Sequence, residues 1–268
     1  WPAGDGTAVY LMRLIVGTAM TFSIALGVVS LVRRDYAAHG AWMLRGYALG
    51  MGAGTQVLGN VVATLKGTDS NDKRIFIISA HLDNMRSNVM DRINDAPGAN
   101  DDGSGCAAVI ECARIMSTRS FPATIIFVTF SGEEQGLLGA YFMAANARKN
   151  NWQIEAVLNN DIMGSISSNE TNITDNTRIR VFSEGLPFFE LDKNAKMIRQ
   201  LGLENDGKSR QLARYVKETG ERYVDNIEVV MVYRNDRFLR GGDHTAFVEN
   251  GFTAVRLTEM NENYTRQH

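Results

Sequence analysis

The chain has 268 residues, of which 44% are hydrophobic and 22% are charged, and its formal net charge is −2. These values are ordinary for a globular protein that buries a large core, and the small net charge gives no support for a nucleic-acid partner. The two cysteines, Cys106 and Cys112, lie on one predicted helix at a spacing that does not favour a disulfide between them. As small core residues they leave the redox compartment undecided.

Residues 1–58 differ in composition from the rest of the chain. Residues 14–32 form a run of 19 residues without a charge, bounded by basic residues on both sides. That length allows a helix to span a bilayer, and a buried core helix is the alternative. A second uncharged run, residues 46–65, is rich in glycine and is the weaker candidate. The sequence therefore predicts a hydrophobic, helical appendage over residues 1–58, with a possible membrane association through residues 14–32.

The segment from Arg33 to Leu49, RRDYAAHGAWMLRGYAL, resembles a family of predicted bacterial membrane proteins of unknown function, and the resemblance runs to about Leu58. It is consistent with an extracytoplasmic or membrane-anchored location. A membrane span over residues 46–65 would include residues 60–65, which are needed as a strand in the sheet that follows. Because these two demands conflict, a fused fragment is the alternative to a true anchor.

From Asn60 onward the pattern is that of an α/β domain, so we assign this domain to residues 59–268. Apolar runs of strand length alternate with helical stretches. Strands are predicted at residues 60–65, 74–80, 123–130, 154–160, 226–233 and 253–258. Helices are predicted at residues 106–116 and 136–147, and over residues 193–222 with an interruption near 202–207. This order predicts a mixed, mostly parallel central β-sheet sandwiched by helices.

Polar side chains follow three of the predicted strands at their carboxyl ends. They are His81, the pair Glu133 and Glu134, and Asp161. In such sheets, sites form beyond the carboxyl ends of the strands, so we expect these side chains to share one edge.

Two glycine-rich turns add further candidates. The turn at residues 97–105, PGANDDGSG, carries Asp101 and Asp102, and either Asp102 or Ser104 can cap the helix that follows. The turn at residues 241–244 carries His244.

Histidine and carboxylate side chains gathered at one edge suit zinc, and less selectively cobalt or manganese. The candidate ligands are His81, Asp101, Glu134, Asp161 and His244. Taken singly, each has an ordinary structural role, such as a hydrogen-bonded histidine, a solvated helix start or a turn cap. Taken together they favour a metal site. Five ligands can serve two ions if one carboxylate bridges, and two ions ~3.5–4 Å apart can hold a bridging water.

Two further carboxylates have candidate roles beside the ligands. Glu133 is adjacent to Glu134 but points elsewhere in an extended chain, and a free carboxylate beside a metal-bound water is suited to be a general base. Asp83 lies two residues after His81 and could accept the other ring N–H of that histidine, which would fix its tautomer.

These motifs together resemble metallopeptidase family 28, the co-catalytic di-zinc aminopeptidases, over residues 60–268. The matching segments are SAHLD at 79–83, APGANDDGSG at 96–105, GEEQG at 132–136, NND at 159–161 and GDH at 242–244. The resemblance implies an eight-stranded mixed sheet in the three-layer zinc-aminopeptidase fold. It also implies two zinc ions and the following site residues: His81 and Asp161 on one ion, Glu134 and His244 on the other, Asp101 bridging, Glu133 as general base, and Asp83 behind His81.

The resemblance predicts an exopeptidase that hydrolyses N-terminal peptide bonds of peptides or small aminoacyl substrates. Glutaminyl cyclases, which share the fold and use one zinc ion, and non-catalytic ectodomains like that of the transferrin receptor are the alternatives. Two departures from the family stand out. Membrane-like sequence replaces its usual leading segment, and the family continues past residues 261–263 with a closing helix, so we expect a C-terminally truncated domain.

Overall fold

The computed structural model describes residues 18–19, 21–23, 25–26, 28–30, 32–35, 59–86, 94–185, 197–198, 200–234 and 241–263. The chain divides into two compact units, Trp1–Leu58 and Gly59–His268. This division follows the composition change predicted near Leu58.

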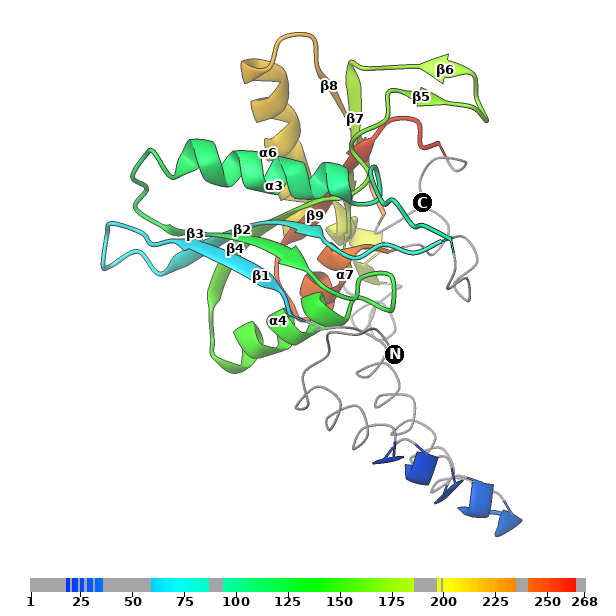
Figure 1. The fold of residues 1–268 in the computed structure, drawn as a ribbon. Helices are drawn as coiled ribbons and strands as arrows, with labels where there is room; N and C mark the ends of the chain where they lie inside the picture. The colour runs from blue at the N-terminus through cyan, green and yellow to red at the C-terminus, as the bar shows by residue number, and fades with distance from the viewer. Residues whose placement is uncertain are drawn as a thin grey trace. The chain divides into compact units, whose positions relative to one another are not determined.

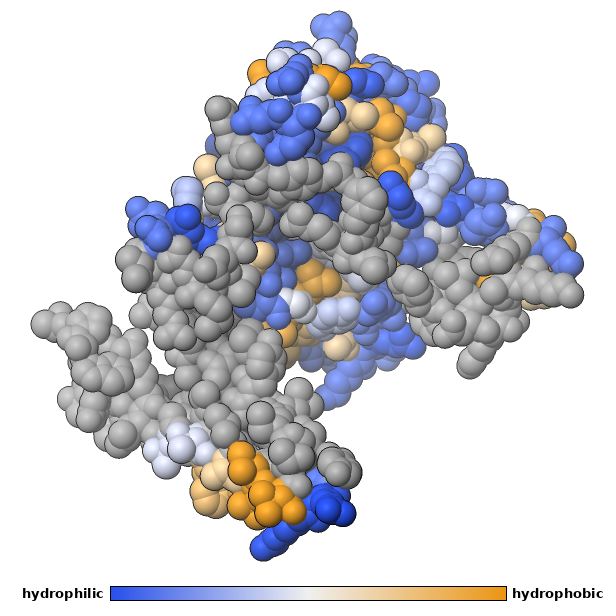
Figure 2. Space-filling model, turned by 90° about the vertical axis from the view of Figure 1, so that its right-hand side faces the viewer, coloured by the Kyte–Doolittle hydropathy of each residue, from blue (hydrophilic) through white to orange (hydrophobic). Residues whose placement is uncertain are grey.

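In the first unit, the described residues between 18 and 32 are helical, and the remainder of the predicted segment 14–32 lies outside the described residues. Exposed apolar side chains gather on this helical stretch and give the hydrophobic atoms seen there in Figure 2; they are Phe22, Val28, Val29 and Val32. In the parts of the chain that the structure describes, no helix combines the length and the apolar character needed to cross a membrane.

The second unit is organised around a seven-stranded sheet with the order β1-β3-β2-β4-β9-β7-β8 (Figure 1). Its strands are β1 (Val61–Leu65), β2 (Arg74–His81), β3 (Thr124–Phe130), β4 (Gln153–Asn160), β7 (Arg178–Ser183), β8 (Glu228–Val232) and β9 (Ala254–Glu259). The pairs β1/β3 and β7/β9 are antiparallel, and the other neighbouring pairs are parallel. The prediction of a mixed, mostly parallel sheet is therefore confirmed. The described residues form seven strands of this sheet, where the resemblance implied eight.

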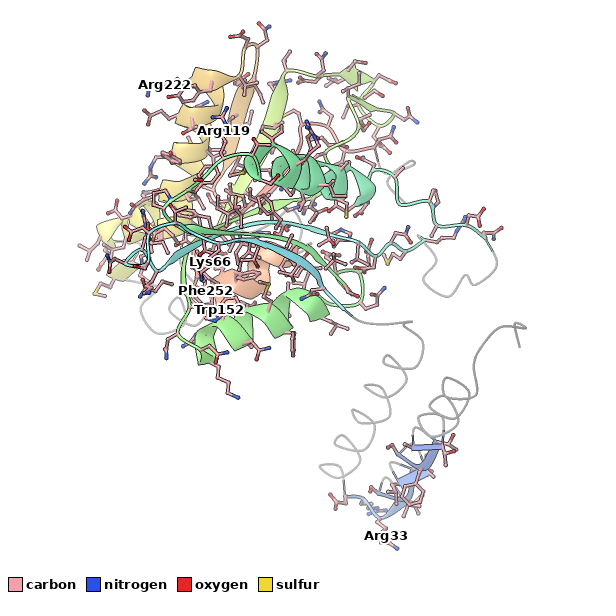
Figure 3. The ribbon with its side chains drawn as sticks, turned by 60° about the vertical axis from the view of Figure 1, so that its left-hand side comes forward. Arg33, Lys66, Arg119, Trp152, Arg222 and Phe252 are labelled. Atoms are coloured by element: carbon pink, nitrogen blue, oxygen red, sulfur yellow. The ribbon has the colours of Figure 1, made fainter. Side chains whose placement is uncertain are left out.

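Helices cover both faces of the sheet. Figure 1 shows α3 (Gly103–Met116) and α6 (Lys208–Tyr223) on one face, and α4 (Leu138–Lys149) and α7 (Asp243–Glu249) on the other. Side chains of β2 alternate between the two cores: Ile77 packs with the α4 and α7 side, while Ala80 packs with the α3 side. Figure 3 shows Phe252, which packs against the first of these cores, on the α4 side of the sheet. Because central strands are buried on both faces, they read as continuous apolar runs in the sequence.

One helix, one strand and one small hairpin were not predicted as they occur. His244 lies in the first turn of α7, where the sequence indicated only a turn. Strand β7 and the small hairpin of β5 (Ser167–Ser168) and β6 (Ile173–Thr174) had no predicted counterpart. The predicted break near residues 202–207 is confirmed, because the 3-10 helix η1 (Leu203–Asp206) and Gly207 separate α6 from the helical residues before it.

Candidate metal centre

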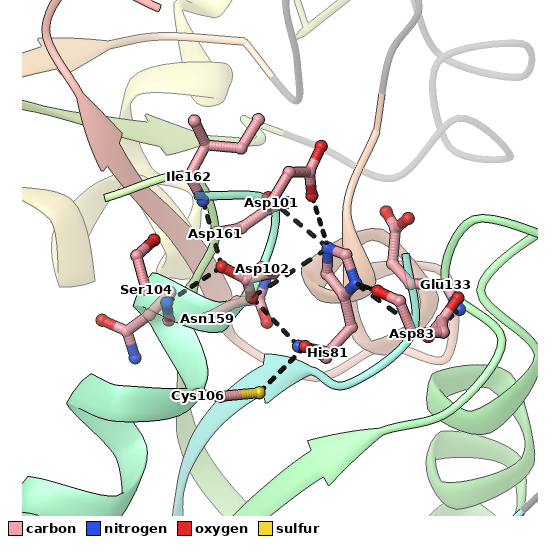
Figure 4. Close-up of polar contacts among 12 residues, drawn as sticks. His81, Asp83, Asp101, Asp102, Ser104, Cys106, Glu133, Asn159, Asp161 and Ile162 are labelled. Carbon is pink, nitrogen blue, oxygen red and sulfur yellow. Dashed lines mark hydrogen bonds and ion pairs between the residues drawn. The ribbon is translucent and has the colours of Figure 1, made fainter. Parts of the chain in front are cut away.

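Three strands deliver the candidate residues to one edge of the sheet. His81 is the last residue of β2, Asp161 directly follows β4, and Glu133 follows β3 by three residues. Since β2 lies between β3 and β4 and runs parallel to both, these carboxyl ends are neighbours. The expectation that the residues share an edge is met, and Figure 4 shows their side chains facing one another.

His81, Asp101 and Asp161 form a compact, buried group. Their side chains offer ligand atoms that all lie within 4.8 Å of one another, which is an arrangement that could hold a metal ion. The Nε2 atom of His81 is 3.0 Å from Oδ1 of Asp101 and 3.7 Å from Oδ1 of Asp161. The three residues are 1%, 4% and 3% exposed, so solvent screens their charges weakly.

The second ring nitrogen of His81, Nδ1, faces the main-chain oxygen of Asp83. Nδ1 lies 2.9 Å from the main-chain oxygen of Asp83 and 3.9 Å from its carboxylate Oδ1. The sequence suggested the carboxylate as this partner, and the structure gives the close contact to the carbonyl instead. A proton on Nδ1 would be donated to that carbonyl, and this tautomer leaves the Nε2 lone pair for a metal.

The Asp83 carboxylate binds the loop that carries both glutamates. Oδ1 accepts from the main-chain N–H groups of Gly132 at 2.8 Å and Glu133 at 3.1 Å, and Oδ2 accepts from that of Glu134 at 3.1 Å. Asp83 therefore holds the main chain at both glutamates in place relative to His81.

Asp102 links three segments of the site. Its Oδ2 accepts from the main-chain N–H of His81 at 3.1 Å, and its Oδ1 accepts from those of Gly105 at 3.0 Å and Ile162 at 3.2 Å. The bond to Gly105 is the predicted helix cap. A Cβ atom at position 105 would lie 2.5 Å from both Asp102 oxygens, so glycine is required for this close approach.

The remaining predicted ligands lie near the group but outside it. Among the described residues, Glu134 and His244 do not join His81, Asp101 and Asp161 in one set of ligand distance. His244 is fully buried at the start of α7. Glu134 is half-buried, and its strongest charged neighbour is Asp101.

Burial and mutual repulsion raise the pKa values of several acids at this edge. Burial raises the pKa of Glu133 and of Asp102 to about 8, with Asp161 adding to both, and it raises that of Glu134 to about 7, with Asp101 adding. Burial lowers the pKa of His81, but its contacts with Asp101 and Asp161 outweigh this and raise it well above the ordinary value.

These observations fit a site for divalent cations. The donor set of imidazole and carboxylate is one that zinc binds, and acids outnumber cations in the cluster. Asp243 adds to the excess: it is fully buried, neither of its carboxylate oxygens has a hydrogen-bond partner among the described residues, and its pKa is raised well above its usual value by burial and by Glu133. A buried excess of negative charge is stabilised by metal ions.

Sequence reasoning missed three residues of this site. The sequence predicts only a capping role for Asp102 and no role for Asp243 or Arg256. Arg256 lies on β9, is 7% exposed, and its Nε is 3.0 Å from Oδ2 of Asp161. A charged residue inside the apolar run of residues 253–258 was the signal, because a buried strand rarely carries an unpaired arginine.

Two family models match the chain. The model of peptidase family M28 matches residues 60–268, and a predicted membrane protein family, DUF2306, matches residues 3–85. The second match therefore extends past Leu58 and overlaps β1 and β2. The two predicted resemblances are both confirmed.

Similar proteins include probable zinc metalloproteases of fungi. One from Pyricularia oryzae is 46% identical over 79% of this chain, and one from Leptosphaeria maculans is 43% identical over 79%. The chain covers 42% and 48% of these relatives, so it spans less than half of their length.

Solved structures share the fold. The LapA aminopeptidase of Legionella pneumophila aligns with a TM-score of 0.51 at 22% identity, covering 75% of this chain and 43% of that one. The gamma-secretase component nicastrin aligns with a TM-score of 0.50 at 9% identity, covering 78% of this chain and 37% of that one. At such identities the likeness concerns the fold alone.

Proposed function

This chain belongs to peptidase family M28 over residues 60–268, and from that premise we propose that it is a zinc-dependent aminopeptidase. It would release residues from the free amino terminus of peptides or small aminoacyl substrates. The observation that carries the proposal is the buried group of His81, Asp101 and Asp161 at the carboxyl edge of the sheet. The names of the fungal relatives as zinc metalloproteases support the metal, and the proposed exopeptidase specificity rests on the resemblance of the sequence motifs.

Two zinc ions fit the proposed ligand set. His81 and Asp161 would hold one ion, Glu134 and His244 the other, and Asp101 would serve both. When bound, the ions supply Lewis acidity toward the substrate carbonyl and toward water. Zinc ions need negatively charged groups around them, and the buried acids near His81 support such a site.

Glu133 is the proposed general base. It would take a proton from the attacking water as the new C–O bond forms and return it to the leaving amine as the C–N bond breaks. Its place supports this role: Glu133 follows the carboxyl end of β3, beside the strand that ends at His81, and a carboxylate beside a metal-bound water is suited to take up a proton. Its main-chain N–H is held by Asp83, which limits the positions its carboxylate can adopt.

Replacing Glu133 by Gln is expected to keep the zinc content and to lower kcat by about 10²–10⁴-fold, because the amide cannot accept the proton. The measurement is zinc content by elemental analysis alongside kcat on aminoacyl-nitroanilides. Glu155→Gln, on an exposed position of β4, is the matched control and should leave both values unchanged. Loss of a zinc ion in Glu133→Gln would instead make Glu133 a ligand, and normal turnover would reject the role.

Zinc stoichiometry of the wild-type chain separates the alternatives. About two ions per chain support the aminopeptidase, about one ion supports a glutaminyl-cyclase-like acyltransferase, and none supports a non-catalytic domain. Substrates with a free and an acetylated amino terminus complete the test. Equal cleavage of both would reject an exopeptidase.

A further inference from the structure

Arg256 places a fixed positive charge inside the candidate metal centre. It lies on the interior strand β9, opposite Asn159 of β4 and Phe182 of β7. Its Nη1 donates to the main-chain oxygen of Gly241 at 3.4 Å, and its Nε lies 3.0 Å from Oδ2 of Asp161. The contact with Asp161 is a close ion pair without hydrogen-bond geometry.

The two oxygens of Asp161 face different groups. Oδ2 faces Arg256, whereas Oδ1 lies 3.7 Å from Nε2 of His81, on the side of the metal-binding group. The chain makes room for this arrangement at Gly242. A Cβ atom there would lie 3.0 Å from Oδ2 of Asp161, 3.2 Å from Cδ of Arg256 and 3.4 Å from Nδ1 of His244.

We propose that Arg256 acts as the built-in counter-cation of the metal centre. It compensates the charge of Asp161 at Oδ2 in the metal-free protein, and a zinc ion on the Oδ1 side would compensate the same charge when it binds. The inference rests on the proposed function, because it assumes that the centre binds zinc.

The ion pair between Arg256 and Asp161 contributes differently to stability in the metal-free and in the zinc-bound protein. In the metal-free protein, removing Arg256 leaves Asp161 buried beside other acids without its nearest cation, and breaking a buried ion pair in this way is strongly destabilising. With zinc bound, the dication compensates the same charge. Loss of Arg256 should therefore destabilise the metal-free form much more than the zinc form, and by linkage it should tighten zinc binding.

The test compares Arg256→Met with Arg180→Met in the full chain. Arg180 is the matched control: it is 6% exposed, lies on the neighbouring strand β7, donates through Nε to the main-chain oxygen of Glu259 at 2.9 Å, and pairs with Glu262 instead of a proposed ligand. Thermal unfolding is measured in EDTA and in saturating zinc, and zinc affinity is measured by competition with a chromophoric chelator.

We expect Arg256→Met to lower the Tm in EDTA clearly more than in zinc, and to lower the Kd for zinc roughly tenfold, which is within the usual range for coupled sites. Arg180→Met should lower the Tm equally in both conditions. Arg256→Lys, which restores the charge without the guanidinium fork, should fall between wild type and Arg256→Met.

Equal losses of Tm for Arg256→Met in EDTA and in zinc, with an unchanged zinc Kd, would overturn the inference. If Arg256→Met does not fold in either condition, Arg256→Lys decides: a larger loss in EDTA supports the inference and an equal loss rejects it. A wild-type chain that binds no zinc would reject the proposed function itself, and with it this inference. That failure is visible in the wild-type titration alone.

Discussion

At the residue scale, Asp102 holds more of the site's main chain in place than its neighbour Asp101 does. Asp101 offers a ligand atom, whereas the Asp102 carboxylate binds main-chain N–H groups on the three segments that carry His81, Asp101 and Asp161. Ligand geometry at a metal site depends on such surrounding hydrogen bonds. Asp101 is therefore the proposed metal ligand of the two, and Asp102 holds the chain segments that carry the ligands.

Replacing Asp102 by Ala leaves three main-chain N–H groups without their acceptor, and we expect it to lower the free energy of unfolding by about 3 kcal/mol or more, at about 1–3 kcal/mol for each group. Ser104→Ala is the control. It removes one hydroxyl, which accepts from the N–H of Met163 at 2.9 Å and donates to the main-chain oxygen of Asn100 at 2.7 Å, so its effect should be about 1–2 kcal/mol. Urea unfolding of the metal-free chain measures both. Similar losses in the two variants would contradict the role of Asp102.

The sequence located individual site residues better than their partners. His81, Glu133 and Asp161 could be placed because each follows an apolar run that reads as a buried strand. The contact of His81 Nδ1 with the Asp83 carbonyl could not be predicted, since main-chain acceptors leave no mark in the residue types. Arg256 was hidden for a related reason: its partner Asp161 is 95 positions away, and only the pairing of β4 with β9 brings them together.

At the scale of elements, the strands that read as apolar runs were predicted, whereas β7, with two arginines, the two-residue strands β5 and β6, and the short helix α7 were not. Strands β2, β3 and β4 are buried on both faces and stand out in the sequence. Strand β7 contains Arg178 and Arg180, and Arg180 is tolerated inside the sheet because Glu262 pairs with it. Helix α7 has seven residues, too few for a helical period to be recognised.

Glu259, at the end of β9, joins this strand to two loops of the site. Its Oε2 accepts from the N–H of Ser165 at 2.6 Å, and both carboxylate oxygens are 3.3 Å from Nδ2 of Asn100. Asn100 in turn accepts from the N–H of Gly164 at 2.6 Å. The loop before α3 and the loop after β4 are thus tied to β9 by one buried carboxylate, which is 4% exposed.

Burial raises the pKa of Glu259 to about 7 from its usual 4.5. Between these values the folded protein keeps a proton that the unfolded chain releases, so this group makes stability fall as pH rises from 4.5 to 7. Glu259→Gln removes the titration and should reduce this fall. The measurement is Tm across the pH range, with Glu228→Gln at an exposed position of β8 as control. A variant that keeps the wild-type slope would contradict the assignment.

At the scale of the whole molecule, two family models match overlapping parts of the chain. The predicted membrane family matches residues 3–85 and the peptidase match begins at residue 60, so both matches include β1 and β2. The division of the structure into Trp1–Leu58 and Gly59–His268 assigns both strands to the peptidase unit. Every proposed ligand and the proposed base also lie in the second unit.

We therefore expect residues 59–268, expressed alone, to fold and to bind as much zinc as the full chain. Zinc content and cooperative thermal unfolding are the measurements. Vesicle sedimentation gives a second comparison: the full chain should bind lipid vesicles through residues 14–32, and the shorter chain should stay in the supernatant. If residues 59–268 fail to fold while the full chain folds, the first unit is a necessary part of the domain. If both chains stay in the supernatant, residues 14–32 are not an anchor.

The hydrogen bonds of Asp83 bear on how this site could be transplanted. The loop with Glu133 and Glu134 carries a proposed base and a proposed ligand, but its main chain is shaped by a carboxylate two residues after His81. The loop is therefore not a separate module. Moving residues 131–137 into another scaffold would carry the glutamates without their support, and residues 81–83 would have to be moved with them at the same spacing.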